Sequence, residues 1–201
     1  MHPPNPKAKP HIVAVCATNP TLIHWFGVHP GPIQTTTAYK ALLGNPEVDS
    51  ACCAVPHAQM YPDILNAGKH LFGEKPFGTY LAQIRTIMAA LDAHLEPITR
   101  CGSGIAFCPG AQKVTDFVKS GAVGEFLEVE ASFLHSPDID LDKLTNWNLM
   151  MDENGEHGCM GDLRVHVLYV SLRLGWHPDT GQASLVTSAT QRADGKGNLV
   201  P

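Results

Sequence analysis

Short apolar runs alternate with amphipathic segments through the first half of the chain. Residues 11–16 (HIVAVC) are nearly continuously apolar, which is typical of a strand buried on both faces of a parallel sheet. Residues 59–66 instead place Met60, Ile64 and Leu65 on one face of a helix. Read in this way, the pattern predicts strands over residues 11–16, 33–37, 48–55, 71–72 and 97–99, and helices over residues 21–26, 38–43, 59–66 and 81–94. Strands that alternate with helices on this scale predict βαβ units with right-handed crossovers.

The pattern changes after about residue 100. It predicts helices over residues 111–120 and 162–174, and an alternating, half-solvated antiparallel strand over residues 126–134. Residues 183–189 are rich in β-branched side chains and are predicted to form another strand. Residues 136–155 read as an irregular polar loop anchored by Trp147, and residues 194–201 as a glycine-rich end with no closing element. The second half is therefore expected to have an α+β fold.

Composition narrows the class of protein. With 201 residues, 44% hydrophobic and 16% charged, the chain suits a soluble globular protein. A net charge of −5 and no basic stripe argue against a nucleic-acid partner. No apolar run approaches the roughly 20 residues that cross a membrane, and the polar, proline-rich residues 1–10 read as a disordered tail rather than a signal peptide. We expect no membrane association and a cytoplasmic location.

Cysteine and histidine usage gives no sign of a disulfide framework or a metal centre. None of the six cysteines forms a Cys-x-x-Cys pair, and reduced thiols in a cytosolic protein are expected. His157, Cys159 and His166 are close in sequence, but their spacing matches no usual zinc pattern. We therefore expect no metal.

The short apolar segment Leu71-Phe72 is followed by Glu74-Lys75-Pro76, a polar corner at which the predicted strand ends. Ligands of open α/β sheets bind at the carboxyl ends of the strands, so this corner is placed to meet one. Burial and neighbouring charge can tune such a lysine or let it bind a substrate hydroxyl or carbonyl. Taken by itself, the tripeptide is more typical of an ordinary surface lysine in a strand-to-helix turn.

Asp162 and His166 stand four residues apart on a predicted helix and so share one face. Histidine is the usual general acid or base near neutral pH, and a nearby carboxylate can fix its tautomer. The plainer interpretation is an ordinary helix pair that contributes a few tenths of a kcal/mol. Arg164 lies between them and could also draw Asp162 into an ion pair.

Taken together, these motifs resemble those of one family. Residues 48–56, the helix end at 67–70 and Glu74-Lys75-Pro76 resemble the glucose–fructose oxidoreductase / inositol dehydrogenase / rhizopine catabolism (Gfo/Idh/MocA) family. Residues 119–124 (KSGAVG) are similar to its Gly-x-x-Gly turn, and residues 158–166 (GCMGDLRVH) to its glycine-rich run leading to Asp-x-x-x-His. Order and spacing agree over roughly residues 11 to 190.

The resemblance implies a Rossmann domain over residues 11–100 and an α+β substrate and oligomerisation domain over residues 101–201. It implies hydride transfer between NAD or NADP and a sugar, polyol or related alcohol. It also leaves open that the chain forms a homo-oligomer. Lys75 would bind the substrate and handle its proton, His166 would act as general base, and Asp162 would be its partner or a substrate contact. Trp147 would help to shape the substrate pocket. The implied cofactor-binding positions are Ala17, Thr18, Asn19, Pro56, His57, Glu74, Lys75 and Pro76, with Glu74 beside the nicotinamide.

The sequence also departs from the family. It contains no Gly-x-Gly-x-x-Gly, the loop whose backbone cradles a pyrophosphate at a helix N-terminus. The spacing from residues 11–16 to 48–54 matches the family's second and fourth strands. We therefore expect a Rossmann-like parallel sheet that lacks its first βα unit, followed by an incomplete α+β domain.

Two functional interpretations follow from these departures. In one, the chain is an oxidoreductase shortened at both ends that keeps Lys75, Asp162 and His166 but binds dinucleotides poorly. In the other, it is a non-catalytic relative, a binding or interaction protein whose exposed sheet edge favours a partner. A third, weaker interpretation is that the chain does not fold stably alone. The substrate and the choice between NAD and NADP stay open.

Overall fold

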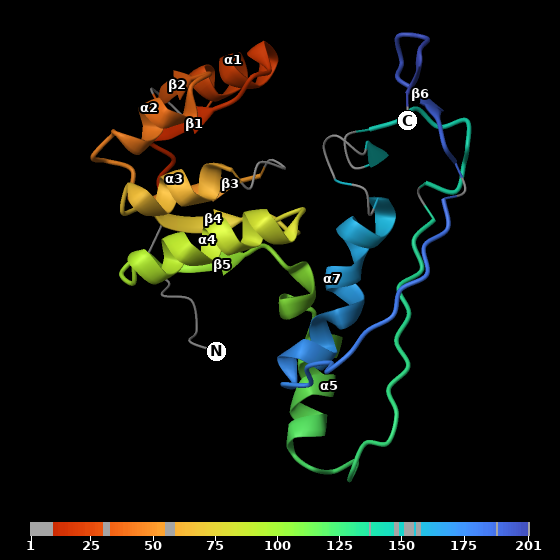
Figure 1. Cartoon of the computed structure of the whole chain (residues 1–201). Coiled ribbons are helices and arrows are strands. Elements are labelled where there is room, and N and C mark those ends of the chain that lie inside the picture. The colour runs from red at the N-terminus through yellow and green to blue at the C-terminus, as the bar shows by residue number, and fades with distance from the viewer. Residues whose placement is uncertain are drawn as a thin grey trace. The chain divides into compact units, whose positions relative to one another are not determined.

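The computed structural model describes residues 10–29, 33–54, 59–136, 138–146, 149–150, 155, 158–187 and 189–200, whose elements are labelled in Figure 1. Backbone contacts divide these residues into two units. The first unit contains the described parts of residues 1–53, 59–72 and 86–100. The second contains residues 73–85, the described parts of residues 101–201, and Ala54.

The first unit opens with two short parallel strands. Strand β1 (Ala14–Cys16) pairs with β2 (Gln34–Thr36), so that Val15 lies opposite Thr35. Between them, α1 (Pro20–Val28) begins at proline, and the side chain of Asn19 accepts a hydrogen bond from the Thr21 amide at 2.9 Å. Asparagine at the N-cap and proline in the first turn together favour a helix start at this point.

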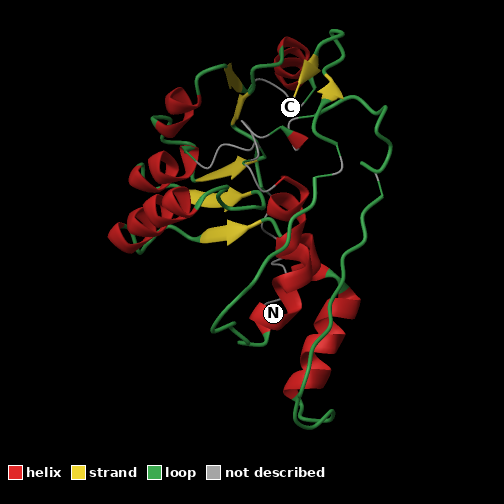
Figure 2. Cartoon of the chain, turned by 45° about the vertical axis from the view of Figure 1, so that its right-hand side comes forward, coloured by secondary structure: helices red, strands yellow, loops and turns green. Residues whose placement is uncertain are grey.

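A three-stranded sheet follows in the order β3-β4-β5, and its arrows point the same way in Figure 2. Its strands are β3 (Ser50–Cys53), β4 (His70–Gly73) and β5 (Thr99–Cys101). The helices between and before them are α2 (Tyr39–Leu43), α3 (Met60–Asn66) and α4 (Leu81–Ala93). The parallel βαβ arrangement predicted from the alternating apolar runs is therefore confirmed.

The core of the first unit is built from these elements. Leu65 of α3, Leu71 of β4 and Ile87 of α4 are at most 2% exposed. Tyr61, which also belongs to α3, is equally buried. Burying an aliphatic side chain of this size fully contributes about 1.5–3 kcal/mol. The apolar face predicted for residues 59–66 thus packs inward as expected, and it holds β4 in place ahead of the Glu74-Lys75-Pro76 corner.

The second unit contains two longer helices and a short hairpin. Its elements are a 3₁₀ turn η1 (Gly104–Phe107), α5 (Pro109–Lys119), α7 (Gly158–Arg173), and the antiparallel pair β6 (Arg192–Ala193) and β7 (Leu199–Val200). The buried guanidinium of Arg192 donates to the carbonyls of Asp138 and Asp140, each at 2.6 Å. Arg192 thereby ties the loop after residue 136 to the hairpin.

Three expectations for the second half differ from the structure. Residues 126–134 form no strand, and neither do the described residues of 183–189. A strand needs a hydrogen-bonded neighbour, and these segments have none among the described residues. Apolar side chains in them, such as Leu127, Leu134 and Val186, are 90% exposed or more. The chain end predicted to lack a closing element instead contains β7.

In the part of the chain that the structure describes, no helix combines the length and the apolar character needed to span a membrane.

Candidate active site

Lys75 follows the last strand residue of β4 by two positions. The Gly73 carbonyl accepts the Gly102 amide at 2.7 Å, and beyond that hydrogen bond the chain leaves the sheet. The Lys75 amide donates to its neighbour Glu74 Oε2 at 3.2 Å, and the peptide bond before Pro76 is cis. Lys75 therefore stands at the carboxyl end of a parallel strand, where the sequence placed it.

A short ion pair joins this corner to helix α7. Lys75 Nζ donates to Asp162 Oδ1 at 2.6 Å, although the two residues are 87 positions apart in the sequence. Their side chains are only 23% and 13% exposed, respectively. A bond of this length between charged groups is stronger than one between neutral groups. It fixes the direction of the ammonium and leaves its other hydrogens to donate elsewhere.

His166 lies one helical turn after Asp162 on α7. Its Nδ1 is buried and has no hydrogen-bond partner among the described residues. Burial lowers the pKa of His166 below the usual value, the Lys75 charge lowers it further, the Asp162 carboxylate opposes this, and His135 adds a smaller lowering effect. The imidazole is therefore neutral at neutral pH, which is the form that accepts a proton.

The structure brings together Lys75, Asp162 and His166, but Asp162 contacts Lys75 rather than His166. Asp162 had been expected as a partner of His166 or a substrate contact. Its carboxylate instead accepts from Lys75, and it acts on His166 through charge. Arg164 forms no ion pair among the described residues. The alternative in which Arg164 draws Asp162 into an ion pair is therefore not found there.

Two neighbours of this cluster were missed by the sequence analysis. The Cys101 thiol at the end of β5 has a pKa raised first by burial and then by Glu74, with Lys75 opposing. That location was deducible, because neighbouring parallel strands β4 and β5 end at the same edge. The ring of Phe133 stacks on His166, with centroids 5.1 Å apart and planes at 25°. No sequence signal pointed to Phe133, since its segment was predicted to be a strand.

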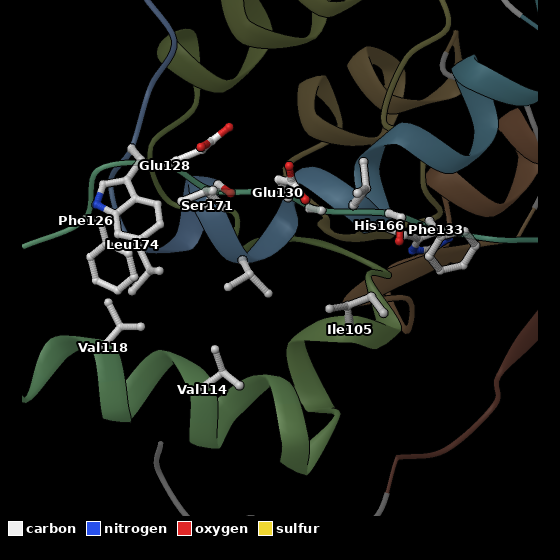
Figure 3. Close-up of a pocket in the computed structure, with 16 residues that line it drawn as sticks. Ile105, Val114, Val118, Phe126, Glu128, Glu130, Phe133, His166, Ser171 and Leu174 are labelled. Atoms are coloured by element: carbon white, nitrogen blue, oxygen red, sulfur yellow. The ribbon is translucent and has the colours of Figure 1, made fainter. Parts of the chain in front are cut away.

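An apolar cleft of about 560 Å³ also lies within the second unit (Figure 3). Its walls come from helices α5 and α7 and from residues 126–133. In Figure 3, His166 and Phe133 lie toward one end and Phe126 toward the other, above Val118 of α5. Phe126 packs there against Trp176, with ring centroids 4.8 Å apart. The cleft therefore places one histidine among mostly hydrophobic walls.

The predicted cofactor positions can be tested against these contacts. After β1, the Ala17 amide donates to Thr36 O at 3.2 Å, and Asn19 is occupied in capping α1. No arginine stands among residues 17–19 to bind a 2′-phosphate. Pro56, His57 and Trp147 lie outside the described residues.

The residues present therefore fit one end of a dinucleotide. Lys75, Asp162 and His166 bring together a hydrogen-bond donor, a carboxylate and a neutral imidazole, groups that could serve an alcohol reacting with a bound nicotinamide. The sequence supplies no glycine-rich loop for the pyrophosphate. The parallel βαβ sheet, with this cluster at the carboxyl end of strand β4, is a Rossmann-like arrangement.

Comparison with known proteins finds a family model that matches the first half of the chain. Residues 4–98 match the family model GFO_IDH_MocA, described as "Oxidoreductase family, NAD-binding Rossmann fold". Over those residues the chain is similar to the NAD-binding Rossmann segment of the Gfo/Idh/MocA oxidoreductases, the family that its motifs resemble. An uncharacterized oxidoreductase, YrbE, of Bacillus subtilis (strain 168) is 30% identical over 122 residues, which is 58% of this chain and 35% of that protein.

Solved structures show the same fold over more of the chain. An NAD-binding oxidoreductase from Klebsiella pneumoniae aligns with a TM-score of 0.82 and 22% identity, covering 98% of this chain and 52% of the other. Levoglucosan dehydrogenase in complex with NADH and levoglucosan aligns with a TM-score of 0.80 and 20% identity, covering 94% and 51%. The chain thus spans about half the length of these two structures and about a third of the curated relative.

Proposed function

We propose that the chain carries the reacting end of an NAD- or NADP-dependent oxidoreductase that acts on a hydroxyl carbon of a sugar, polyol or related alcohol. The observation that carries this proposal is the Lys75–Asp162 pair at 2.6 Å beside a half-buried, neutral His166 whose Nδ1 is buried. Similar structures include a levoglucosan dehydrogenase and a scyllo-inositol dehydrogenase, and this supports the substrate class.

Each side chain has a distinct role in the proposed reaction. Lys75 donates a hydrogen bond to the substrate oxygen and holds it in place, while Asp162 keeps the ammonium oriented. His166 accepts the hydroxyl proton, because hydride can leave the carbon only as that proton is removed. The nicotinamide, when bound, would supply the hydride acceptor, and Glu74 would lie beside it. The cluster's low exposure keeps water from competing for the substrate oxygen.

The proposed division of labour follows the two predicted domains. Residues 11–100 form the nucleotide-binding part, and residues 101–201 form the part that binds substrate and associates with a second copy. The Glu74-Lys75-Pro76 corner belongs to the second structural unit, together with Asp162 and His166. We also propose a cytoplasmic location, since the five cysteines described form no disulfide with one another: Cys16, Cys52, Cys53, Cys101 and Cys108.

The test has a binding arm and a turnover arm. NADH and NADPH are titrated into the chain while nucleotide fluorescence is followed, and we expect weak binding because no glycine-rich loop is present. Dissociation constants in the low micromolar range would contradict that expectation. Turnover is then sought with inositols and levoglucosan as alcohols.

Point variants assign the turnover. Lys75→Met and His166→Ala should each lower kcat/KM by about 10²–10⁴-fold, the usual range for a positioned acid or base. Lys143→Met is the matched control, since Lys143 also pairs with an aspartate of the second unit, Asp138, at 2.8 Å. His177→Ala is the histidine control, because His177 is exposed. Equal loss in a variant and its control would remove the assigned role.

A non-catalytic binding protein is the second candidate, and a specific observation favours it. Apolar side chains of the second unit, among them Leu127, Leu134 and Val186, are almost fully exposed. Exposed apolar surface on this scale marks interaction sites. Under this alternative, the chain shows no turnover with any alcohol tested, and Lys75→Met leaves nucleotide binding unchanged.

A further inference from the structure

The imidazole of His166 has an unusual set of contacts for a general base. A histidine in that role ordinarily donates one ring N–H to a carboxylate or carbonyl, which fixes its tautomer and its plane. Here Nδ1 is buried without a partner among the described residues, and the carboxylate one helical turn before it, Asp162, accepts from Lys75. Hydrogen bonding within the described chain therefore does not orient His166.

An aromatic ring takes that place. Phe133 lies across the face of His166 with a centroid distance of 5.1 Å and an interplanar angle of 25°, an offset-stacked geometry. The same ring also stacks with His135, two residues further along the extended segment, at 6.2 Å and 21°. Residues two apart in an extended chain point to the same side, which explains how Phe133 and His135 share this arrangement.

We propose that Phe133 is a positioning residue for His166, fixing the plane of the imidazole and shielding its buried face from water. The catalytic use of this arrangement rests on the function proposed above, whereas the stacking and shielding do not. The ring replaces the missing hydrogen-bond partner: it leaves the imidazole few orientations and offers it no proton acceptor.

The charged groups around His166 set the background for a test. Lys75 approaches from the segment after β4, Asp162 from α7 itself, and His135 from the extended segment that also carries Phe133. Burial is the largest cause of the lowered pKa of His166, ahead of all three charges. Removing a shielding ring should therefore act on this property directly, without any change of charge.

The experiment is an NMR titration of the full chain labelled at histidine Cε1, with the His166 signal assigned by its loss in His166→Gln. Phe133→Leu keeps an apolar side chain but removes the ring, and Phe133→Tyr restores the ring. The matched control is Phe126→Leu, because Phe126 lies in the same segment with the same 41% exposure but packs on Trp176 instead.

The proposal predicts that Phe133→Leu abolishes the ring-current shift of the His166 Cε1 proton and raises the pKa of His166. Phe133→Tyr should retain both wild-type values, and Phe126→Leu should leave both unchanged. An unchanged shift and pKa in Phe133→Leu, or equal changes in Phe126→Leu, would overturn the proposal.

These readouts need neither cofactor nor turnover, so they separate this inference from the proposed function. If His166→Ala leaves turnover intact, the proposed function fails. The titration would still show whether Phe133 stacks on His166 and shields it. Where turnover is measured, Phe133→Leu should lower kcat by about tenfold and KM little, as expected for a misplaced base. A loss confined to KM would contradict the positioning role.

Discussion

Replacing Asp162 with asparagine tests the contact on which the candidate site depends. The substitution keeps the shape of the side chain but removes its charge, so Lys75 keeps an acceptor and loses its counter-ion. The two charges lie 2.6 Å apart with side chains 23% and 13% exposed. The question is how much free energy of unfolding this pair contributes.

The magnitude follows from the geometry. At 2.6 Å and an effective dielectric constant near 20, Coulomb attraction amounts to about 6 kcal/mol. Much of this is offset by the water that both ions lose on burial. Removing one partner of a fully buried pair costs about 3–5 kcal/mol, but the part-exposed Lys75 ammonium can regain some water. We therefore expect Asp162→Asn to lower the free energy of unfolding by about 2–3 kcal/mol.

The matched control is Asp138→Asn. Asp138 pairs with Lys143 at 2.8 Å in the same unit, but the side chains are 28% and 39% exposed. Pairs that solvent reaches contribute about 0–1 kcal/mol. Urea unfolding followed by circular dichroism measures both variants against the wild type. Equal losses in the two variants, or a loss below about 0.5 kcal/mol in Asp162→Asn, would refute the reasoning about the buried pair.

The Lys75–Asp162 pair also predicts the direction in which the pKa of His166 changes in two variants. The Asp162 carboxylate raises the pKa of His166 and the Lys75 ammonium lowers it. Asp162→Asn should therefore lower the pKa of His166 further, and Lys75→Met should raise it. Histidine titration by NMR reads both, and shifts in the same direction would contradict the described arrangement.

Three further predictions concern local features. Gly155 has φ of 81°, and a methyl group there would collide with Thr79 Cγ2, so Gly155→Ala should destabilise the chain by about 1–3 kcal/mol in urea unfolding, against Gly181→Ala as a control in open space. Tyr39 donates to Asp63 at 2.7 Å, which lowers the pKa of Asp63, so Tyr39→Phe should raise that pKa toward its ordinary value when carboxyl signals are titrated by NMR. Because the pKa of His166 is lowered in the folded state, the unfolded chain binds more protons between the two pKa values, and stability should fall as pH drops from about 6.5 through the folded pKa. His166→Gln should remove that part of the pH dependence of urea unfolding, and a dependence that persists unchanged would assign it to another group.

Local pattern predicted much of the first unit. Two patterns depend only on neighbouring residues: a short apolar run and a 3.6-residue period. They located β1, β3, α3 and α4 to within a few positions. The same locality placed Asp162 and His166 on one helix, since α-helical hydrogen bonds join residues four apart. It also placed Lys75 directly after a strand.

The second half shows where local pattern fails. Residues 126–134 alternate in polarity as a strand would, yet the segment forms no strand. An α-helix closes its hydrogen bonds within its own sequence, whereas a strand depends on a partner that its own residues do not specify. Alternation therefore predicts a preference, and only the neighbouring chain decides whether a ladder forms.

By itself, then, the sequence determined the parallel βαβ plan, the lysine corner and the helix carrying an aspartate and a histidine. Only the tertiary structure decided that Asp162 pairs with Lys75 rather than serving His166, and that Phe133 covers the imidazole. The physical reason is distance along the chain. Side chains 87 residues apart meet at 2.6 Å because of packing, and no local periodicity encodes which carboxylate oxygen a lysine will reach.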